Sequence, residues 1–318
     1  MDLTITSCGH CYDLAGNLTS HGTDPGCPRG TSYTINDAQQ MTGKSTSTGG
    51  TWSYDKIGNE TAASTPDYTR TGETWTDHSR MSSITVNGAT YAGQYGSTDQ
   101  SEHIKLGDTA FHNGPLGLSA KTTAGADMGF NREPGGTLNS MTTGGKTYFY
   151  LTDAIGSVVA LADIDGNKVD SYTYSPRGVR ILAQSTEPVA QLCRFAGNYE
   201  DPTGLYRLQA RYYDANFGRY TQPAPSGQEQ NPYLYAEGDP VNRIDPTGLF
   251  SWSDALDIGS DIFGVVTGCL SGIAAPSTSG VTEFASVFGP AGTAAAVIGS
   301  CAVGGVAGYY GADLITYD

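Results

Sequence analysis

The residues best suited to chemistry are acids that begin a repeated segment. The sequence DPTGL occupies residues 201–205 and again 245–249, and a near-copy, APSG at 224–227, has alanine where an aspartate is expected. Two carboxylates that lie close together can share a proton, so that one activates water while the other protonates an amide. The same pattern is typical of tight turns, in which proline sets φ and glycine takes a positive φ. The two interpretations are compatible, because a strained turn could also present a peptide bond to the acids.

A second group of candidate residues lies near the start of the chain. Cys8, His10, Cys11 and Cys27 are of types that bind zinc. Their spacing fits no standard zinc finger, and no second Cys or His pair follows them. We therefore expect a Cys8–Cys27 or Cys11–Cys27 disulfide, or free thiols, in preference to a metal site. We predict no cofactor.

The composition indicates a β protein that does not bind nucleic acid. The 318 residues include 43 glycines and 20 tyrosines, and tyrosine and threonine between glycine-containing turns favour many short strands. The formal net charge of −15 argues against a nucleic-acid partner, because phosphate binding needs clustered lysine and arginine. The first residues lack the pattern of a secretory signal peptide. A dedicated secretion machine would then export the parent protein, unless this chain is cut from a longer one.

A short motif recurs between residues 12 and 178 of the chain. YDLAGNL at 12–18 returns as YDKIGN at 54–59, and degenerate copies follow at 130–138, 163–169 and 172–178. Each copy joins an aromatic or apolar strand end to a glycine-containing turn, which predicts a hairpin. Repeated hairpins of this kind stack on their neighbours. We therefore expect stacked hairpins over residues 1–147.

The segment before residue 249 carries a specific family resemblance. ARYYDANFGRYTQPAPSG at 210–227, followed by NPYLYAEGDPVNRIDPTGL at 231–249, resembles the core of Rhs/YD-repeat proteins. That family includes polymorphic toxins and the shell-forming C components of insecticidal Tc toxins. The resemblance is dense over 148–249, thinner before it, and absent from the tail. It implies that the repeats wind into a hollow β-shell, here a partial one, and that the core plugs the shell.

The resemblance also implies a self-cleavage site. In the family a pair of aspartates cuts the chain just after the last DPxGL, which places the scissile bond between Leu249 and Phe250. Asp245 matches one catalytic aspartate, and Ala224 stands at the position of its partner. Alanine cannot ionise, so we expect an inactive site and hypothesise that the natural residue at 224 is aspartate. A rival pairing joins Asp201 to Asp245.

Two arginines are candidates for a supporting role beside the acids. Arg219 or Arg211 would sit near the acid pair and tune it. The alternative is structural, with arginines pairing with carboxylates and stacking on tyrosines to fix the plug.

The tail at 250–318 differs in kind from the rest. No charged residue occurs over 262–282 or 284–312, and a helix is expected to begin near 251–254. Gly304, Gly308 and Ala312 follow the small-residue spacing of packed membrane helices. Three interpretations remain: a membrane-inserting hairpin, a linker to a missing toxin, or a small enzymatic toxin. Two further cysteines in the tail could form a disulfide or remain buried thiols, namely Cys269 and Cys301.

The predicted architecture is mainly β, with repeats at 1–147, a core at 148–249 and a small helical apolar tail at 250–318. The predicted function is a toxin-enclosing shell with an aspartyl-protease-like core. The alternatives are a non-enzymatic scaffold or a cell-surface adhesion protein with a membrane-inserting tail. The expected partners are the chain's own C-terminal segment as cargo, an immunity protein, a secretion apparatus and a target membrane. We expect export by a bacterial secretion system, or display at the cell surface.

Overall fold

The structure is a computed structural model that describes residues 9–22, 30–45, 49–65, 69–97, 100–227 and 229–249. The helical tail expected at 250–318 lies outside these residues. No helix within the described ranges is long and apolar enough to cross a membrane.

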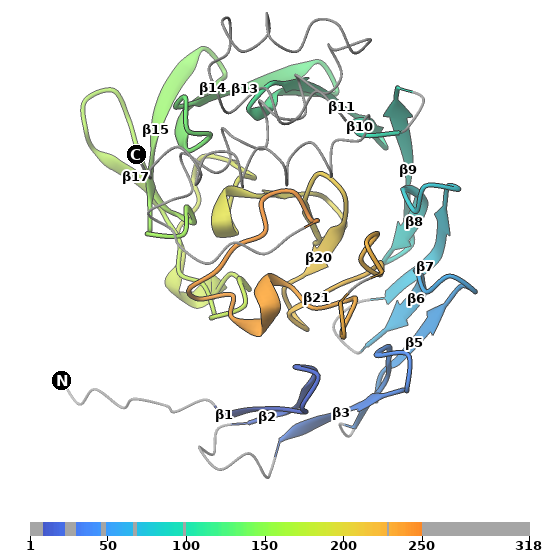
Figure 1. Ribbon diagram of the computed structural model, residues 1–318. Helices are drawn as coiled ribbons and strands as arrows, with labels where there is room; N and C mark the ends of the chain where they lie inside the picture. Colours follow the sequence, from blue (N-terminus) through green and yellow to red (C-terminus); the bar gives the residue numbers. More distant parts are fainter. Residues whose placement is uncertain are drawn as a thin grey trace, which may run out of the picture.

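Within these ranges, seventeen antiparallel strands form one continuous meander, because each strand pairs with the next along the chain. Their bounds are β1 (Gly9–Tyr12), β2 (Leu18–Gly22), β3 (Thr31–Ile35), β4 (Met41–Ser45), β5 (Thr51–Tyr54), β6 (Glu60–Ser64), β7 (Thr69–Trp75), β8 (Met81–Val86), β9 (Ala89–Gly96), β10 (Glu102–Leu106), β11 (Thr109–Gly114), β12 (Gly117–Thr123), β13 (Ala126–Arg132), β14 (Leu138–Thr143), β15 (Lys146–Thr152), β16 (Val158–Ala162) and β17 (Lys168–Ser171). The sheet curves around the following segment, and its two end strands, β1 and β17, do not pair with each other among the described residues (Figure 1). The prediction of a partial β-shell is confirmed.

The recurring motif forms the hairpin turns that drive this meander. In the first copy, Oδ1 of Asp13 accepts hydrogen bonds from the backbone N–H groups of Ala15 and Asn17, both at 2.9 Å. Gly16 takes φ +77° in the same turn, where a side chain would be strained. The second copy repeats this arrangement around Asp55, whose Oδ1 lies 2.9 Å from the N–H of Asn59. The aspartate and glycine of the motif are therefore local turn residues.

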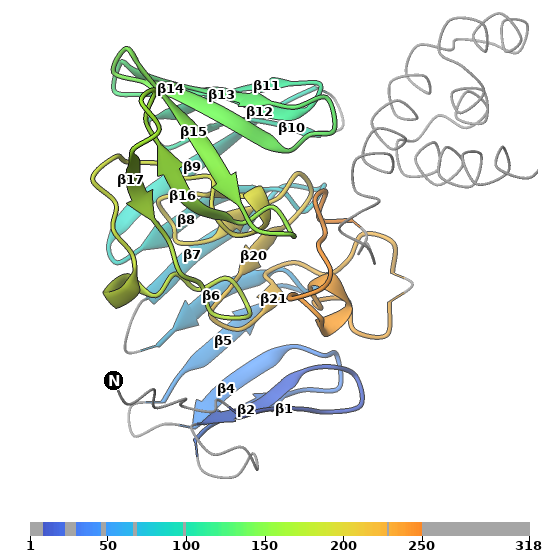
Figure 2. The ribbon, with the colours of Figure 1, turned by 90° about the vertical axis from the view of Figure 1, so that its left-hand side faces the viewer.

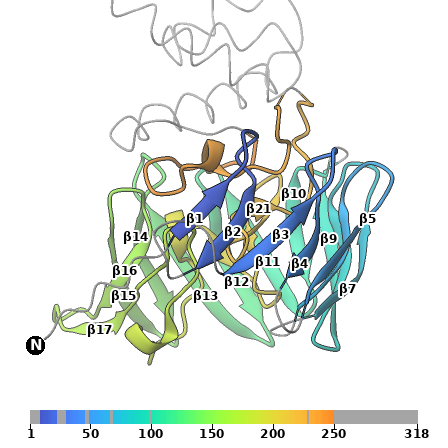
Figure 3. The ribbon, with the colours of Figure 1, turned by 90° about the horizontal axis from the view of Figure 1, so that it is seen from below.

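Whereas β15–β17 belong to the sheet itself, the part of the core segment that follows β17 lies inside the curve of the sheet (Figures 2 and 3). Its elements are short, as expected for a plug: η1 (Leu182–Gln184), η2 (Phe195–Gly197), β18 (Tyr199–Glu200), β19 (Tyr206–Arg207), β20 (Tyr212–Asp214), β21 (Arg219–Tyr220) and η3 (Ala236–Gly238). The four strands form a second antiparallel sheet. Aromatic rings pack in a buried cluster of the core. Tyr213 stacks on Tyr235 in this cluster, with ring centroids 4.1 Å apart.

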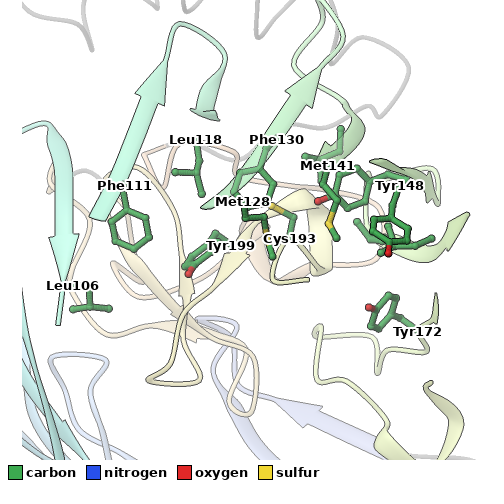
Figure 4. Close-up of a cluster of buried hydrophobic side chains, with 14 residues drawn as sticks. Leu106, Phe111, Leu118, Met128, Phe130, Met141, Tyr148, Tyr172, Cys193 and Tyr199 are labelled. Carbon is green, nitrogen blue, oxygen red and sulfur yellow. The ribbon is translucent and has the colours of Figure 1, made fainter. Parts of the chain in front are cut away.

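Apolar side chains join the shell to the core. Alternate residues of the shell strands point inward, so that Phe111, Phe130 and Met141 lie in one cluster with Tyr199 and Cys193 of the core (Figure 4). Burying such side chains contributes about 25 cal/mol per Å² of apolar surface. Side chains of the shell and the core therefore pack in the same hydrophobic cluster.

Candidate functional site

The Asp245 side chain closes the turn that ends the core. Its Oδ1 accepts hydrogen bonds from the backbone N–H groups of Gly248, at 2.7 Å, and Leu249, at 3.1 Å. Gly248 has φ +73°, and a Cβ there would lie 2.9 Å from the backbone nitrogen of Arg211. The carboxylate is fully buried and touches the residue whose carbonyl belongs to the expected scissile bond.

The second oxygen of Asp245 faces the core. Its Oδ2 accepts a hydrogen bond of 2.7 Å from the Tyr220 hydroxyl and forms a buried ion pair of 3.3 Å with Nη2 of Arg211. The Arg211 guanidinium also lies over the Tyr220 ring, 3.6 Å from its centroid. Burial, and next the Asp245 charge, raises the pKa of the Tyr220 hydroxyl well above its usual value. Tyr220 therefore remains a neutral hydrogen-bond donor to the carboxylate.

Arg211 connects Asp245 to the position of its expected partner. Nη1 of Arg211 donates to the Pro232 carbonyl at 3.1 Å, and the backbone N–H of Ala224 donates to the same carbonyl at 2.8 Å. Nε of Arg211 donates to the Gly248 carbonyl. Ala224 is buried. Arg211 thus contacts Asp245 directly and shares the Pro232 carbonyl with the backbone of Ala224. The methyl side chain of Ala224 carries no acidic proton.

Comparison with known proteins places the fold in a family. A family model described as Teneurin YD-shell matches residues 128–235. Over these residues the chain is a YD-shell protein, in agreement with its resemblance to the Rhs/YD-repeat family. The tRNA3(Ser)-specific nuclease WapA of Bacillus spizizenii is 31% identical over 217 residues, or 63% of this chain and 9% of the relative.

Two further relatives of this YD-shell protein come from different sources. Salivary gland surface protein 1 of Aedes aegypti is 34% identical over 51% of this chain and 4% of the relative. Double-stranded DNA deaminase toxin A of Burkholderia cenocepacia is 31% identical over 35% of this chain and 8% of the relative. The chain thus spans less than a tenth of each of these relatives. The Photorhabdus luminescens Tc holotoxin pore aligns with a TM-score of 0.45 and 17% identity, covering 76% of this chain and 16% of that chain.

The two candidate arginines of the YD-shell core have different environments. Arg211 contacts Asp245, whereas Arg219 donates to the Gln39 carbonyl and lies 4.8 Å from the Tyr233 ring centroid. Arg219 thus fits the structural interpretation, and Arg211 fits the supporting one. No sequence pattern predicts that Tyr220 contacts Asp245. The only sequence signal is that Tyr220 directly follows the candidate Arg219 in the core motif.

Asp201 forms a turn of its own, separate from the one at Asp245. Its Oδ1 accepts hydrogen bonds from the backbone N–H and the hydroxyl of Thr203, the former at 2.9 Å. Burial, opposed by the Thr203 hydrogen bonds, raises the pKa of Asp201 to about 6. Both DPTGL segments therefore form the expected turn. The described contacts of Asp201 do not include Asp245, so they give the rival pairing no support.

The cysteine and histidine candidates divide between described and undescribed residues. Cys11 is disulfide-bonded, and a sulfur in a disulfide is not the thiolate that binds zinc. His10 stacks on His21 with centroids 6.0 Å apart. Cys8 and Cys27 lie outside the described residues, and within those residues no group of three potential ligands could hold a metal ion.

Proposed function

We propose that this chain is the shell-and-core part of an Rhs-type toxin and that its core cuts the bond between Leu249 and Phe250. The observation that carries the proposal is the Asp245 carboxylate, which is fully buried and hydrogen-bonded to the N–H of Leu249 at 3.1 Å. A turn alone does not need a buried carboxylate that also binds an arginine and a tyrosine hydroxyl. The toxin relatives support the encapsulating role.

The proposed reaction is hydrolysis of one peptide bond. One carboxylate takes a proton from water, the water oxygen attacks the Leu249 carbonyl carbon, and the other acid protonates the Phe250 nitrogen as the C–N bond breaks. The products are a Leu249 carboxylate and a Phe250 amine. Asp245 supplies one acid, and an aspartate at position 224 supplies the other. Arg211 and Tyr220 position Asp245.

Ala224→Asp tests this proposal. Intact mass should show two fragments for this variant and one uncut chain for the Ala224 form, and the smaller fragment should begin at Phe250. Ala224→Asn is the matched control, because it adds a similar volume without an acid. Ala224→Asp combined with Asp245→Asn should also stay uncut. Cutting elsewhere, or cutting in either control, would refute the assignment.

The proposed organisation follows from the same reading. Residues 1–147 would form the repeats of the shell, 148–249 the core segment, whose strands β15–β17 complete the shell sheet, and 250–318 the cargo or its leader. The cargo's partners would be an immunity protein and a target membrane. A bacterial secretion system would export the whole protein.

A second candidate function is a shell that encloses its cargo without cutting it. The alanine at position 224 favours it, because the site as it stands has a single acid. An uncut Ala224→Asp protein would support this function. The similarity to an Aedes aegypti surface protein makes display at the cell surface a third, weaker possibility.

A further inference from the structure

Two arginines of the core line one small cavity at the boundary with the shell. Arg177 follows β17, and Arg219 lies in β21. The shell side of the cavity is formed by residues of the first motif copy, among them Asn17 and Leu18, and by Met41 of β4. The cavity has room for roughly one or two water-sized particles, which excludes a nucleotide or a sugar.

Each arginine carries a buried N–H donor without a partner. Nη1 of Arg177 and Nε of Arg219 are both buried and make no hydrogen bond within the described part of the chain. Arg219 is 8% exposed, and its Nη2 is already committed to the Gln39 carbonyl. A buried polar group without a partner costs free energy, and the cost is larger for a charged group.

The two arginines also lack a direct ion-pair partner among the described residues. The chain has 32 acidic and 17 basic residues, yet neither Arg177 nor Arg219 forms an ion pair among the described residues. Glu60 and Asp13 are the carboxylates whose charges act on Arg219. Glu60 is paired with Arg70, and Asp13 accepts three hydrogen bonds inside its own turn. The acids near the cavity are therefore already engaged.

We propose that this cavity binds a monovalent inorganic anion of the size of chloride, between Arg177 and Arg219. Charge-assisted hydrogen bonds from two guanidinium groups would satisfy both unpaired donors. The apolar walls strengthen the attraction, because they lower the local dielectric constant. The anion binds only where shell and core meet, so it stabilises their joined state.

Thermal unfolding of the full chain tests the site at constant ionic strength, with sodium chloride exchanged for sodium gluconate, whose anion is too large for the cavity. The midpoint temperature of unfolding should be about 3 °C higher in saturating chloride than in gluconate. Arg177→Gln should remove this difference. Arg180→Gln is the matched control, because Arg180 already pairs with Glu187, and it should keep the chloride response. Equal midpoints in both salts for the unchanged chain, or a full response in Arg177→Gln, would overturn the proposal.

Bromide provides a test that needs no variant. Crystals of the full chain soaked in bromide should show an anomalous peak between Arg177 Nη1 and Arg219 Nε. Density at that place without an anomalous signal would mean a water molecule and would also overturn the proposal.

Discussion

Arg70 of shell strand β7 and Asp214 of core strand β20 form a buried ion pair, with Nη1 and Oδ2 2.7 Å apart. Arg70 also binds the carboxylates of Glu60, at 2.6 Å, and Glu73, at 3.4 Å. All four side chains are buried. Three carboxylates thus surround one guanidinium at the joint between shell and core, and this excess of buried negative charge favours a protonated carboxyl group.

This cluster should make stability fall as pH rises. Burial, and next the charge of Glu60, raises the pKa of Glu73 well above 4.5 in the folded protein. The folded state therefore keeps a proton that the unfolded state loses. The resulting stabilisation is fully present below pH 4.5, the pKa of Glu73 in the unfolded chain, and is lost as pH rises through the pKa of Glu73 in the folded protein. Between these two pKa values the free energy of unfolding should fall by about 1.4 kcal/mol per pH unit. Urea unfolding across that range measures it.

Glu73→Gln identifies the group responsible. The amide matches the protonated acid in shape and does not titrate, so the slope should flatten. Glu102→Gln, at an exposed shell position, serves as the control and should keep the slope of the unchanged chain. If the free energy of unfolding of Glu73→Gln depends on pH as steeply as that of the unchanged chain, a group other than Glu73 holds the proton.

Gly58→Ala should weaken the contact between shell and core. Gly58 has φ +97°, and a Cβ there would lie 2.6 Å from the Tyr233 hydroxyl, which donates to the Gly58 carbonyl. We expect a loss of about 2–3 kcal/mol in the free energy of unfolding. Gly166→Ala separates the two causes, because Gly166 has φ +82° with open space around it and should lose only about 1 kcal/mol. Equal losses in chemical denaturation would show that packing on Tyr233 contributes nothing.

Arg211→Lys should slow self-cleavage in the Ala224→Asp background. A lysine cannot make the hydrogen bonds that Arg211 makes to Asp245, Pro232 and Gly248. We expect the cleavage rate to fall by at least about tenfold, which is ~1.4 kcal/mol of transition-state stabilisation. A time course of fragment formation measures this. Arg219→Lys is the comparison and should cut at nearly the unchanged rate, provided that circular dichroism shows both variants folded.

The isolated peptide 250–318 should release dye from anionic liposomes. It contains two long runs without charge, and such runs insert into bilayers or aggregate when exposed. The matched peptide carries Gly304→Lys and Gly308→Lys, and it should release far less dye at the same micromolar concentration. No release by the unchanged peptide, together with a water-soluble monomer, would favour the linker interpretation of the tail.

The sequence by itself determined the local structure of this protein. The turn at Asp13 and Gly16 depends on hydrogen bonds between residues at most four apart, so the motif is enough to predict it. The same holds for the turn at Asp245, where the acid binds the N–H groups of Gly248 and Leu249. Local chemistry of this kind does not depend on the rest of the fold.

Only the tertiary structure decided which side chains meet around Asp245. Arg211 and Arg219 are both arginines of one short core segment, and no periodicity separates them. Arg211 reaches Asp245 across 34 residues, whereas Arg219 reaches Gln39 across 180 residues in the shell. The way the core strands turn inside the curved sheet sets these contacts. A sequence pattern records neighbours along the chain, and the curvature of the shell brings together residues that no such pattern relates.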